Sequence, residues 1–258
     1  MYFWNVLKLF MARHSQYANI KKRKEGTDKI RGKVFTVHAK LIEIAAKRGG
    51  DPMMNPGLRS AIDKAKADNV PNANIDRAVR RGTGEDKEGV VYEEATYEAF
   101  GPEGSVFMID VITDNKNRSL GNLRVILQKK GGNLGAAGSV GWKFESKAYF
   151  EISGAAANEE TEMKIIDCGA DDLISLGEGK YEVYASPEKL GEVKNALIKA
   201  DFKVEKDELV WKAKDEIRVN DVALGKQILD IIEAVEEDDD VKSITSNIHI
   251  DESIFGQL

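Results

Sequence analysis

Metal-binding and redox-active side chains are scarce in this chain of 258 residues. It has one cysteine, Cys168, and three histidines, His14, His38 and His249. A single cysteine excludes an internal disulfide framework, and the wide spacing of the histidines leaves no recognisable zinc-ligand pattern. Cys168 has no histidine near it in sequence, so it is better explained as a small buried hydrophobic residue than as a nucleophile. We expect no metal or other cofactor, and a reducing, cytoplasmic location fits best.

Long apolar runs are also missing. Residues 1–10 are apolar but too short to span a bilayer, and no small-residue cleavage site follows them. We therefore predict neither a signal peptide nor a membrane partner. We take Met11 as the true start and residues 1–10 as an upstream extension, with a short amphipathic anchor as the alternative interpretation.

The usual local patterns of catalysis are absent as well. No Ser/His/Asp, Cys/His or paired-carboxylate arrangement has a local sequence pattern. The Gly-rich stretch 131–140 lacks the Lys-Ser/Thr ending of a P-loop and the strand-loop-helix context of a dinucleotide site, so it is interpreted as a flexible connection. The five acids Glu236–Asp240 are most simply a solvated turn, with a cation site as the lesser alternative. We predict that the protein is no enzyme, and an enzyme using a cleft between domains is the distant alternative.

Charge, in contrast, is plentiful and unevenly distributed. The formal net charge is −6, yet residues 11–50 hold eleven Lys and Arg against three acidic residues. This local excess of eight positive charges leaves −14 for the remainder of the chain. Like charges packed together repel, so the block favours a surface for a polyanion, and nucleic acid is the first candidate. A merely solvated helix face is the alternative.

The densest cationic run, Lys21–Lys24, lies beside side chains that can stack or form hydrogen bonds. Tyr17 can stack on a base, while Ser15 and Asn19 can bind phosphate or base edges. Asn117 and Arg118 open a predicted helix and suit phosphate contact, although turn and cap chemistry also explains them. The predicted nucleic-acid-binding residues are His14, Ser15, Tyr17, Asn19, Lys21, Lys22, Arg23, Lys24, Lys29, Arg31, Lys33, Arg59, Arg77, Arg80, Arg81, Asn117 and Arg118.

Hydrophobic periodicity predicts a basic three-helix domain over residues 11–85. Apolar residues from Val34 to Ala45 follow one helical face. Asn55 and Pro56 are an N-cap and first-turn pair for a second helix, and a third helix is expected to stop at Gly82.

From Tyr92 onward the pattern changes to strands interleaved with helices, which favours an α+β multidomain protein with two ferredoxin-like α/β domains. The last helix and strand have no complete module of their own. We therefore predict that they return to complete the first sheet, so that 86–150 plus 214–258 form one domain and 151–213 are inserted into it. The predicted strands are 92–100, 105–113, 140–144, 148–152, 172–176, 180–185, 202–211 and 241–250, and the predicted helices are 118–130, 159–168, 187–200 and 221–237.

Several long motifs, in one order, resemble those of the YebC/PmpR family of transcriptional regulatory proteins. They are Met11-Ala-Arg-His-Ser-Gln-Tyr-Ala-Asn-Ile-Lys-Lys-Arg-Lys, Gly50-Asp-Pro-Met-Met-Asn-Pro-Gly-Leu-Arg, Thr113-Asp-Asn-Lys-Asn-Arg-Ser and Gly131-Gly-Asn-Leu-Gly-Ala-Ala-Gly-Ser-Val-Gly-Trp. Arg13, Gln16, Tyr17 and Ala99 depart from the usual pattern. The resemblance implies a three-domain cytoplasmic regulator.

The resemblance implies two kinds of nucleic-acid partner. Members of the family are described as DNA-binding transcriptional regulators, while others look like ribosome-associated factors, among them a mitochondrial translational activator of cytochrome oxidase. A basic segment with Tyr, Asn and Ser could bind rRNA or tRNA as well as duplex DNA. The sequence leaves both partners open and assigns no oligomeric state.

Overall fold

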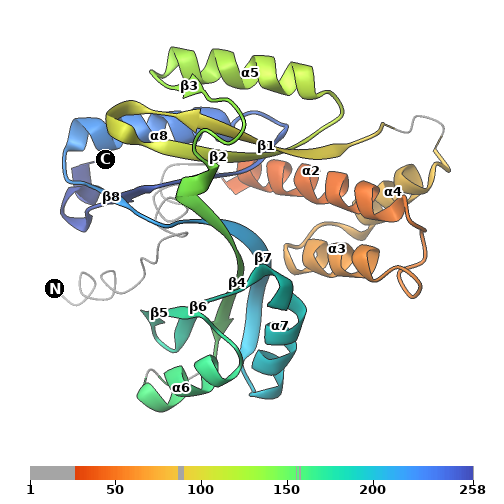
Figure 1. Cartoon of the computed structure of the whole chain (residues 1–258). Helices are drawn as coiled ribbons and strands as arrows, with labels where there is room; N and C mark the ends of the chain where they lie inside the picture. The colour runs from red at the N-terminus through yellow and green to blue at the C-terminus, as the bar shows by residue number, and fades with distance from the viewer. Residues whose placement is uncertain (1–26, 87–89, 155, 157, 258) are drawn as a thin grey trace. The chain divides into compact units, whose positions relative to one another are not determined.

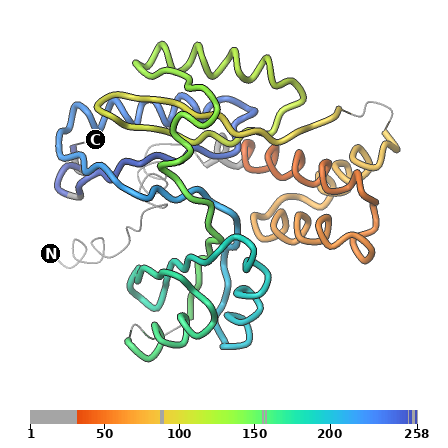
Figure 2. Tube along the Cα trace, viewed as in Figure 1, coloured from red at the N-terminus to blue at the C-terminus, as the bar shows by residue number. Residues whose placement is uncertain are grey.

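The computed structural model describes residues 27–86, 90–154, 156 and 158–257. The chain divides into two compact units, which are described separately. Of the described residues, the split unit comprises 27–86, 90–140 and 221–246, and the inserted unit comprises 141–154, 156, 158–220 and 247–257. Figure 2 follows the chain out of the split unit after Val140 and back into it at Asp221.

The split unit begins with the helices α2 (Thr27–Ala46), α3 (Pro56–Ala67) and α4 (Asn72–Thr83). Their apolar faces meet in one core that includes Ile42, Leu58 and Ile75. The predicted cap is confirmed, because the side chain of Asn55 accepts a hydrogen bond from the Leu58 backbone N at 3.1 Å. This cap satisfies an N–H group that the first turn of α3 would otherwise leave unpaired.

Gly82 does not stop the third helix, so that prediction is wrong. The helix continues to Thr83 and is capped by Gly84, whose φ of 80° is in the left-handed region. Gly82 is instead needed for close helix packing, since a Cβ atom there would lie 2.5 Å from the Glu43 carbonyl oxygen. The missing side chain lets α4 pack directly against the backbone of α2.

The sheet of the split unit is four-stranded and antiparallel, in the order β3-β1-β2-β9. The strand β2 is central and seven of its eight residues are buried, and Figure 1 shows α5 and α2 on opposite sides of the strands β1 and β2. Because β9 pairs with β2, the predicted return of the last helix and strand is confirmed. The elements are β1 (Glu93–Phe100), β2 (Val106–Thr113), α5 (Lys116–Lys129), β3 (Asn133–Leu134), α8 (Val222–Glu236) and β9 (Val241–Ser246), with a 3-10 turn η2 (Pro102–Gly104).

The inserted unit has the ferredoxin-like order β5-β6-β4-β7, with two helices packed on one face of the sheet. The sheet of the split unit differs from this expected connectivity, because β1 and β2 both precede α5, the first helix after the sheet begins. The elements of the inserted unit are η3 (Gly141–Lys143), β4 (Phe144–Ser153), α6 (Glu159–Asp167), β5 (Asp172–Gly177), β6 (Lys180–Ala185), η4 (Pro187–Lys189), α7 (Leu190–Lys199), β7 (Lys203–Ala213), β8 (Ile217–Val219), β10 (Ile248–Ile250) and η5 (Glu252–Gln257).

Three predicted strands and one predicted connection differ from the structure. The strands expected at 140–144 and 148–152 are the turn η3 followed by one long strand, β4, so the second sheet begins at Phe144. The expected strand 241–250 is divided, because β10 leaves the first sheet and pairs in parallel with β8. The Gly-rich connection contains a short strand, β3, whose Leu134 pairs with Ala99.

Candidate nucleic-acid interface

The structure describes the side chains of seven of the predicted binding residues. Lys29 and Arg31 lie within α2. The predictions for His14, Ser15, Tyr17, Asn19, Lys21, Lys22, Arg23 and Lys24 lie outside the described residues. The seven described residues are Lys33, Arg59, Arg77, Arg80, Arg81, Asn117 and Arg118.

Arginines without internal partners lie on the exposed surface of the three helices. Arg77 and Arg80 are three residues apart on α4, which places both guanidinium groups on one face of the helix. Within the described part of the chain neither forms an ion pair or side-chain hydrogen bond. The same holds for Arg48, in the turn after α2, and for Arg59 on α3. These four cations are available to an external anion.

Arg81, the next residue on α4, is tethered. Its guanidinium lies 3.6 Å from the carboxylate of Glu43 on α2, whose side chain is only 6% exposed. Burial raises the pKa of Glu43, and the neighbouring Arg81 opposes that shift. The pair joins α2 and α4, and about half of the Arg81 side chain still faces solvent.

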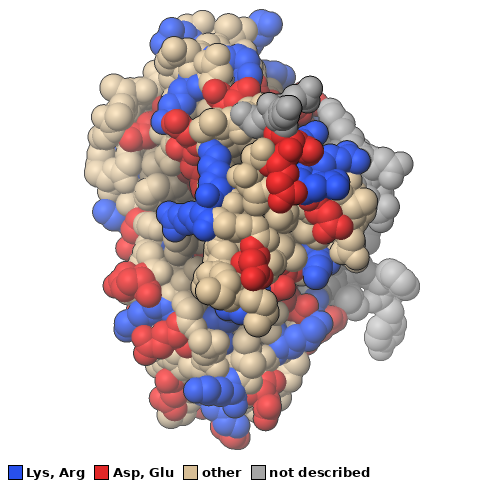
Figure 3. Space-filling model, turned by 90° about the vertical axis from the view of Figure 1, so that its right-hand side faces the viewer, with Lys and Arg blue, Asp and Glu red and all other residues tan. Residues whose placement is uncertain are grey.

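The face that carries α3 and α4 has both signs of charge. Figure 3 shows several groups of Lys and Arg side chains there, with acidic side chains between them. The acids on these two helices include Asp63 and Asp76. The described face is therefore suited to a few discrete phosphate contacts.

Part of the basic block of residues 11–50 binds the acidic turn of the same chain. The Lys33 ammonium donates to the carbonyl oxygens of Glu236 and Asp238 at the end of α8. The Lys40 ammonium donates to the carbonyl oxygens of Ile112 and Asp239, at 2.9 and 2.8 Å. Carbonyl groups at a helix C-terminus attract cations, so these contacts fix α2 against α8 and β2.

Asp240 is the centre of this contact. The prediction of a solvated turn is wrong for this residue, because its side chain is buried. Its carboxylate, 8% exposed, accepts from Lys40 at 3.0 Å, Arg118 at 2.7 Å and Ser119 at 2.7 Å, and also from Thr113 at 3.1 Å. Burial opposes ionisation of this group. The hydrogen bonds from Arg118, Ser119 and Lys40 outweigh burial and lower the pKa of Asp240 to about 2.

Arg118, predicted as a phosphate ligand, is held by two carboxylates. Its guanidinium lies 2.7 Å from both Asp114 and Asp240, although 47% of the side chain remains exposed. Asn115 caps α5 by accepting a hydrogen bond from the Arg118 backbone N. Cap chemistry therefore accounts for Asn115, while Asn117 is exposed at the same helix start.

The Gly-rich loop binds an anion that belongs to the same chain. The backbone N–H groups of Gly138 and Val140 donate to the two carboxylate oxygens of Glu98, at 2.6 and 2.5 Å. Backbone N–H groups that converge on one anion can also hold phosphate. Here the carboxylate of Glu98 on β1 uses them, so the loop closes onto the first sheet.

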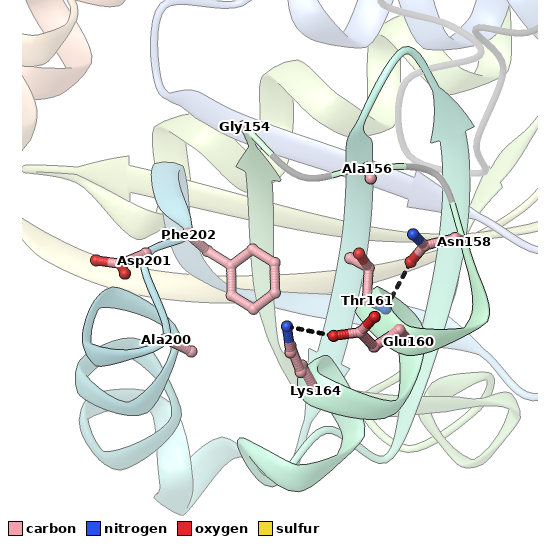
Figure 4. A pocket seen from close by; sticks show the side chains of 9 residues that line it. All are labelled: Gly154, Ala156, Asn158, Glu160, Thr161, Lys164, Ala200, Asp201 and Phe202. Carbon is pink, nitrogen blue, oxygen red and sulfur yellow. Dashed lines mark hydrogen bonds and ion pairs between the residues drawn. The ribbon is translucent and has the colours of Figure 1, made fainter.

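The inserted unit contains a surface hollow and a buried carboxylate. A hollow of about 300 Å³ lies where α6 begins, and Figure 4 shows the ring of Phe202 near the ion pair of Lys164 and Glu160. Both ionic side chains are largely exposed, which makes them a surface pair. Glu182 is fully buried and accepts from the hydroxyl groups of Tyr149 and Tyr184, at 3.2 and 2.9 Å, and burial raises its pKa.

Among the described residues, no three His, Cys, Asp or Glu side chains come together as a metal site. No helix in the same residues has the length and apolar character needed to cross a membrane. Cys168 is half-buried against the core of the inserted unit, and burial raises the pKa of its thiol.

Comparison with known proteins assigns the family. The family model described as "TACO1/YebC protein N-terminal domain" matches residues 15–85, and the one described as "TACO1/YebC second and third domain" matches residues 92–248. The chain belongs to the TACO1/YebC family. The resemblance seen in the sequence motifs is thereby confirmed.

Relatives of this TACO1/YebC chain match it over nearly its whole length. A protein of Nitrosococcus oceani is 42% identical over 250 residues, which is 96% of this chain and 100% of that protein. One from Persephonella marina is 41% identical with the same coverage. Both are named "Probable transcriptional regulatory protein". A crystal structure of a conserved hypothetical protein from Aquifex aeolicus, 39% identical, superposes with a TM-score of 0.77 over 86% of this chain and 91% of that one.

Sequence reasoning missed the role of Lys40 and Asp240 in this TACO1/YebC chain. One signal was present, because Lys40 interrupts the apolar stripe of α2 between Val37 and Leu41. A charged residue inside a buried stripe requires a partner of opposite charge. The sequence does not show which of the many acidic residues that partner is.

Proposed function

We propose that this protein is a nucleic-acid-binding regulator of gene expression, with DNA as its ligand. The observation that carries the proposal is that Arg77 and Arg80 lie on one exposed face of α4 without partners in the described residues. Exposed guanidinium groups bind phosphate oxygens and release condensed counterions from DNA. Arg48 and Arg59 are further exposed arginines without a side-chain partner in the described residues. The names of the relatives, which refer to transcriptional regulation, support the proposal.

The proposed interface includes the basic segment that precedes α2. Lys21, Lys22, Arg23 and Lys24 supply its highest density of positive charge. Replacing all four with Ala should weaken binding and reduce the salt slope by about 0.9 for each duplex phosphate contact that is lost. An unchanged slope would place the interface elsewhere on the chain.

The described arginines are tested by Arg77→Ala/Arg80→Ala, with affinity for a DNA duplex measured over a range of salt concentrations. We expect weaker binding and a salt slope reduced by up to about 0.9 per arginine. Lys129→Ala/Lys130→Ala is the matched control, since these exposed lysines on and after α5 also lack a side-chain partner among the described residues. Equal effects of the two double variants would contradict a specific role for α4.

A regulator could instead act on the ribosome through rRNA or tRNA. Sedimentation of cell extracts at moderate salt distinguishes the two settings. Association with ribosomes that is lost in the Arg77→Ala/Arg80→Ala variant would assign the same cations to translation. Selective binding to a promoter fragment in excess competitor DNA, without ribosome association, is the result expected from our proposal.

A further inference from the structure

Trp142 is unusually exposed for its residue type. It lies in the turn η3 at the start of the inserted unit, and 66% of its surface faces solvent. Tryptophan is highly buried on average, because its ring removes a large apolar area from water. An exposed ring of this size is a candidate contact for a ligand.

The backbone around Trp142 is fixed. The Lys214 ammonium donates to the Trp142 carbonyl oxygen, and the Lys214 backbone N donates to the Lys143 carbonyl oxygen, both at 2.9 Å. The next residue, Phe144, is 97% buried and begins the strand β4. The indole is thus presented from an anchored turn at the start of β4, an internal strand of the sheet.

Positive charge adjoins the ring. The Lys143 ammonium lies 5.4 Å from the ring centroid, and that of Lys214 is bound to the carbonyl group of the same tryptophan. Of the nearby acids, Glu145 is directed to Lys147 at 3.8 Å, while Asp215 follows Lys214 in sequence. One ammonium group near the ring and a second on the backbone of the same residue favour a ligand that is both flat and anionic.

We propose that Trp142, Lys143 and Lys214 form a stacking site for an unpaired nucleobase of single-stranded nucleic acid. The inference rests on the proposed function that this protein binds nucleic acid. Base–aromatic stacking tolerates any base, and adjacent lysines neutralise the flanking phosphates. Bases inside a duplex do not present their faces, so the site takes single strands, loops or ends.

Tryptophan fluorescence reports on this site directly. In a Trp4→Phe/Trp211→Phe background, Trp142 is the sole indole of the chain. Titration with single-stranded DNA and RNA oligonucleotides of about 12 nucleotides, near the upper end of typical site sizes, should quench its emission to saturation. The two oligonucleotides show which sugar is preferred, and a duplex of the same sequence should quench much less.

Affinity measurements separate stacking from charge. Trp142→Ala should weaken single-strand binding about tenfold with an unchanged salt slope, whereas Trp142→Phe should retain most of the affinity. Lys143→Ala should lower the slope by about 0.7. The ring is mostly exposed, so the melting temperature of Trp142→Ala should stay within about 2 °C of wild type.

Two results would overturn the inference in distinguishable ways. If Trp142→Ala binds single strands as wild type does while Arg77→Ala/Arg80→Ala weakens duplex binding, the stacking site is refuted and the proposed function stands. If the wild-type protein binds neither single strands nor duplex, both proposals fail. The supporting result is quenching of Trp142 emission that Lys143→Ala reduces in the single-tryptophan background, together with weaker single-strand binding by Trp142→Ala in the otherwise wild-type protein.

Discussion

At the scale of single residues, one carboxylate joins several elements of the split unit. Asp240 binds Lys40 from α2, Thr113 from β2 and both Arg118 and Ser119 from α5. Removing one partner of a buried ion pair leaves the other charge uncompensated, which costs more than the pair itself contributes. Asp240 is therefore the structurally critical residue of the acidic run Glu236–Asp240.

Asp240→Asn should lower the free energy of unfolding by about 3 kcal/mol, because the Lys40 ammonium would lose its buried counter-charge. Chemical denaturation measures the change. Asp239→Asn is the matched control, since Asp239 is the preceding residue and is exposed. Equal losses in the two variants would show that the effect arises from net charge and not from the buried contact.

The pH dependence of stability follows from the same carboxylate. The pKa of Asp240 is about 2 in the folded protein, below its ordinary value of 3.8. Its stabilisation is complete above the unfolded pKa and is lost as the pH falls toward 2. Glu182 acts in the opposite direction, because its raised pKa makes protonation favour the folded state. Denaturation of wild type and Asp240→Asn from pH 5 to pH 2 should therefore show a smaller loss in the variant, and parallel curves would refute the assignment.

At the scale of elements, the close contact between α2 and α4 depends on Gly82. The predicted third helix was placed correctly, but its end was not. A glycine near the end of an apolar pattern looks like a cap in the sequence. Only the packing of α4 on α2 shows that this glycine serves close approach and that Gly84 is the cap.

Gly82→Ala should destabilise the protein by about 2 kcal/mol, because the new methyl group would clash with the Glu43 carbonyl oxygen and force the helices apart. Gly121→Ala on α5 should have the opposite sign and stabilise by about 0.5–1 kcal/mol, since no atom lies within 4 Å of the added Cβ. Thermal unfolding of the two variants provides the comparison. The same sign in both would contradict the close-packing explanation.

Elements with strong local patterns were predictable, and those set by partners were not. The central strand β2 and the capped helix α3 follow from hydrophobic pattern and cap chemistry. The two-residue strand β3 exists through its pairing with β1, and β10 through its pairing with β8. Likewise the candidate arginines could be identified by sequence. The contacts of Lys33 with Glu236 and of Arg118 with Asp240 could not, because each joins residues more than 100 positions apart.

At the scale of the whole molecule, the inserted unit interrupts the split unit without interrupting its sheet. The strand β2 pairs with β9, although residues 141–220 separate the two parts of that unit. The contacts between α5 and α8 and between Lys40 and Asp240 also join the two parts. The split unit is therefore held together by noncovalent contacts across the interruption.

Cleavage within the inserted unit should leave the chain associated. A protease recognition sequence placed at Glu178, an exposed residue in the turn between β5 and β6, would allow a single cut in the folded protein. The two fragments should co-elute in size-exclusion chromatography under native conditions and separate only in denaturant. Separation without denaturant would show that the pairing of β2 with β9 does not sustain the unit. The uncut variant controls for the inserted sequence.

The pairing of β2 with β9 also has a consequence for synthesis of the chain. About 130 residues separate the end of β2 from the start of β9, and a ribosome adds about 5–20 residues per second. For roughly 6–25 seconds, then, one edge of an almost wholly apolar strand is displayed by the nascent polypeptide before its neighbour has been made. During that interval the strand is open to chaperones, and to the same strand on an adjacent nascent chain.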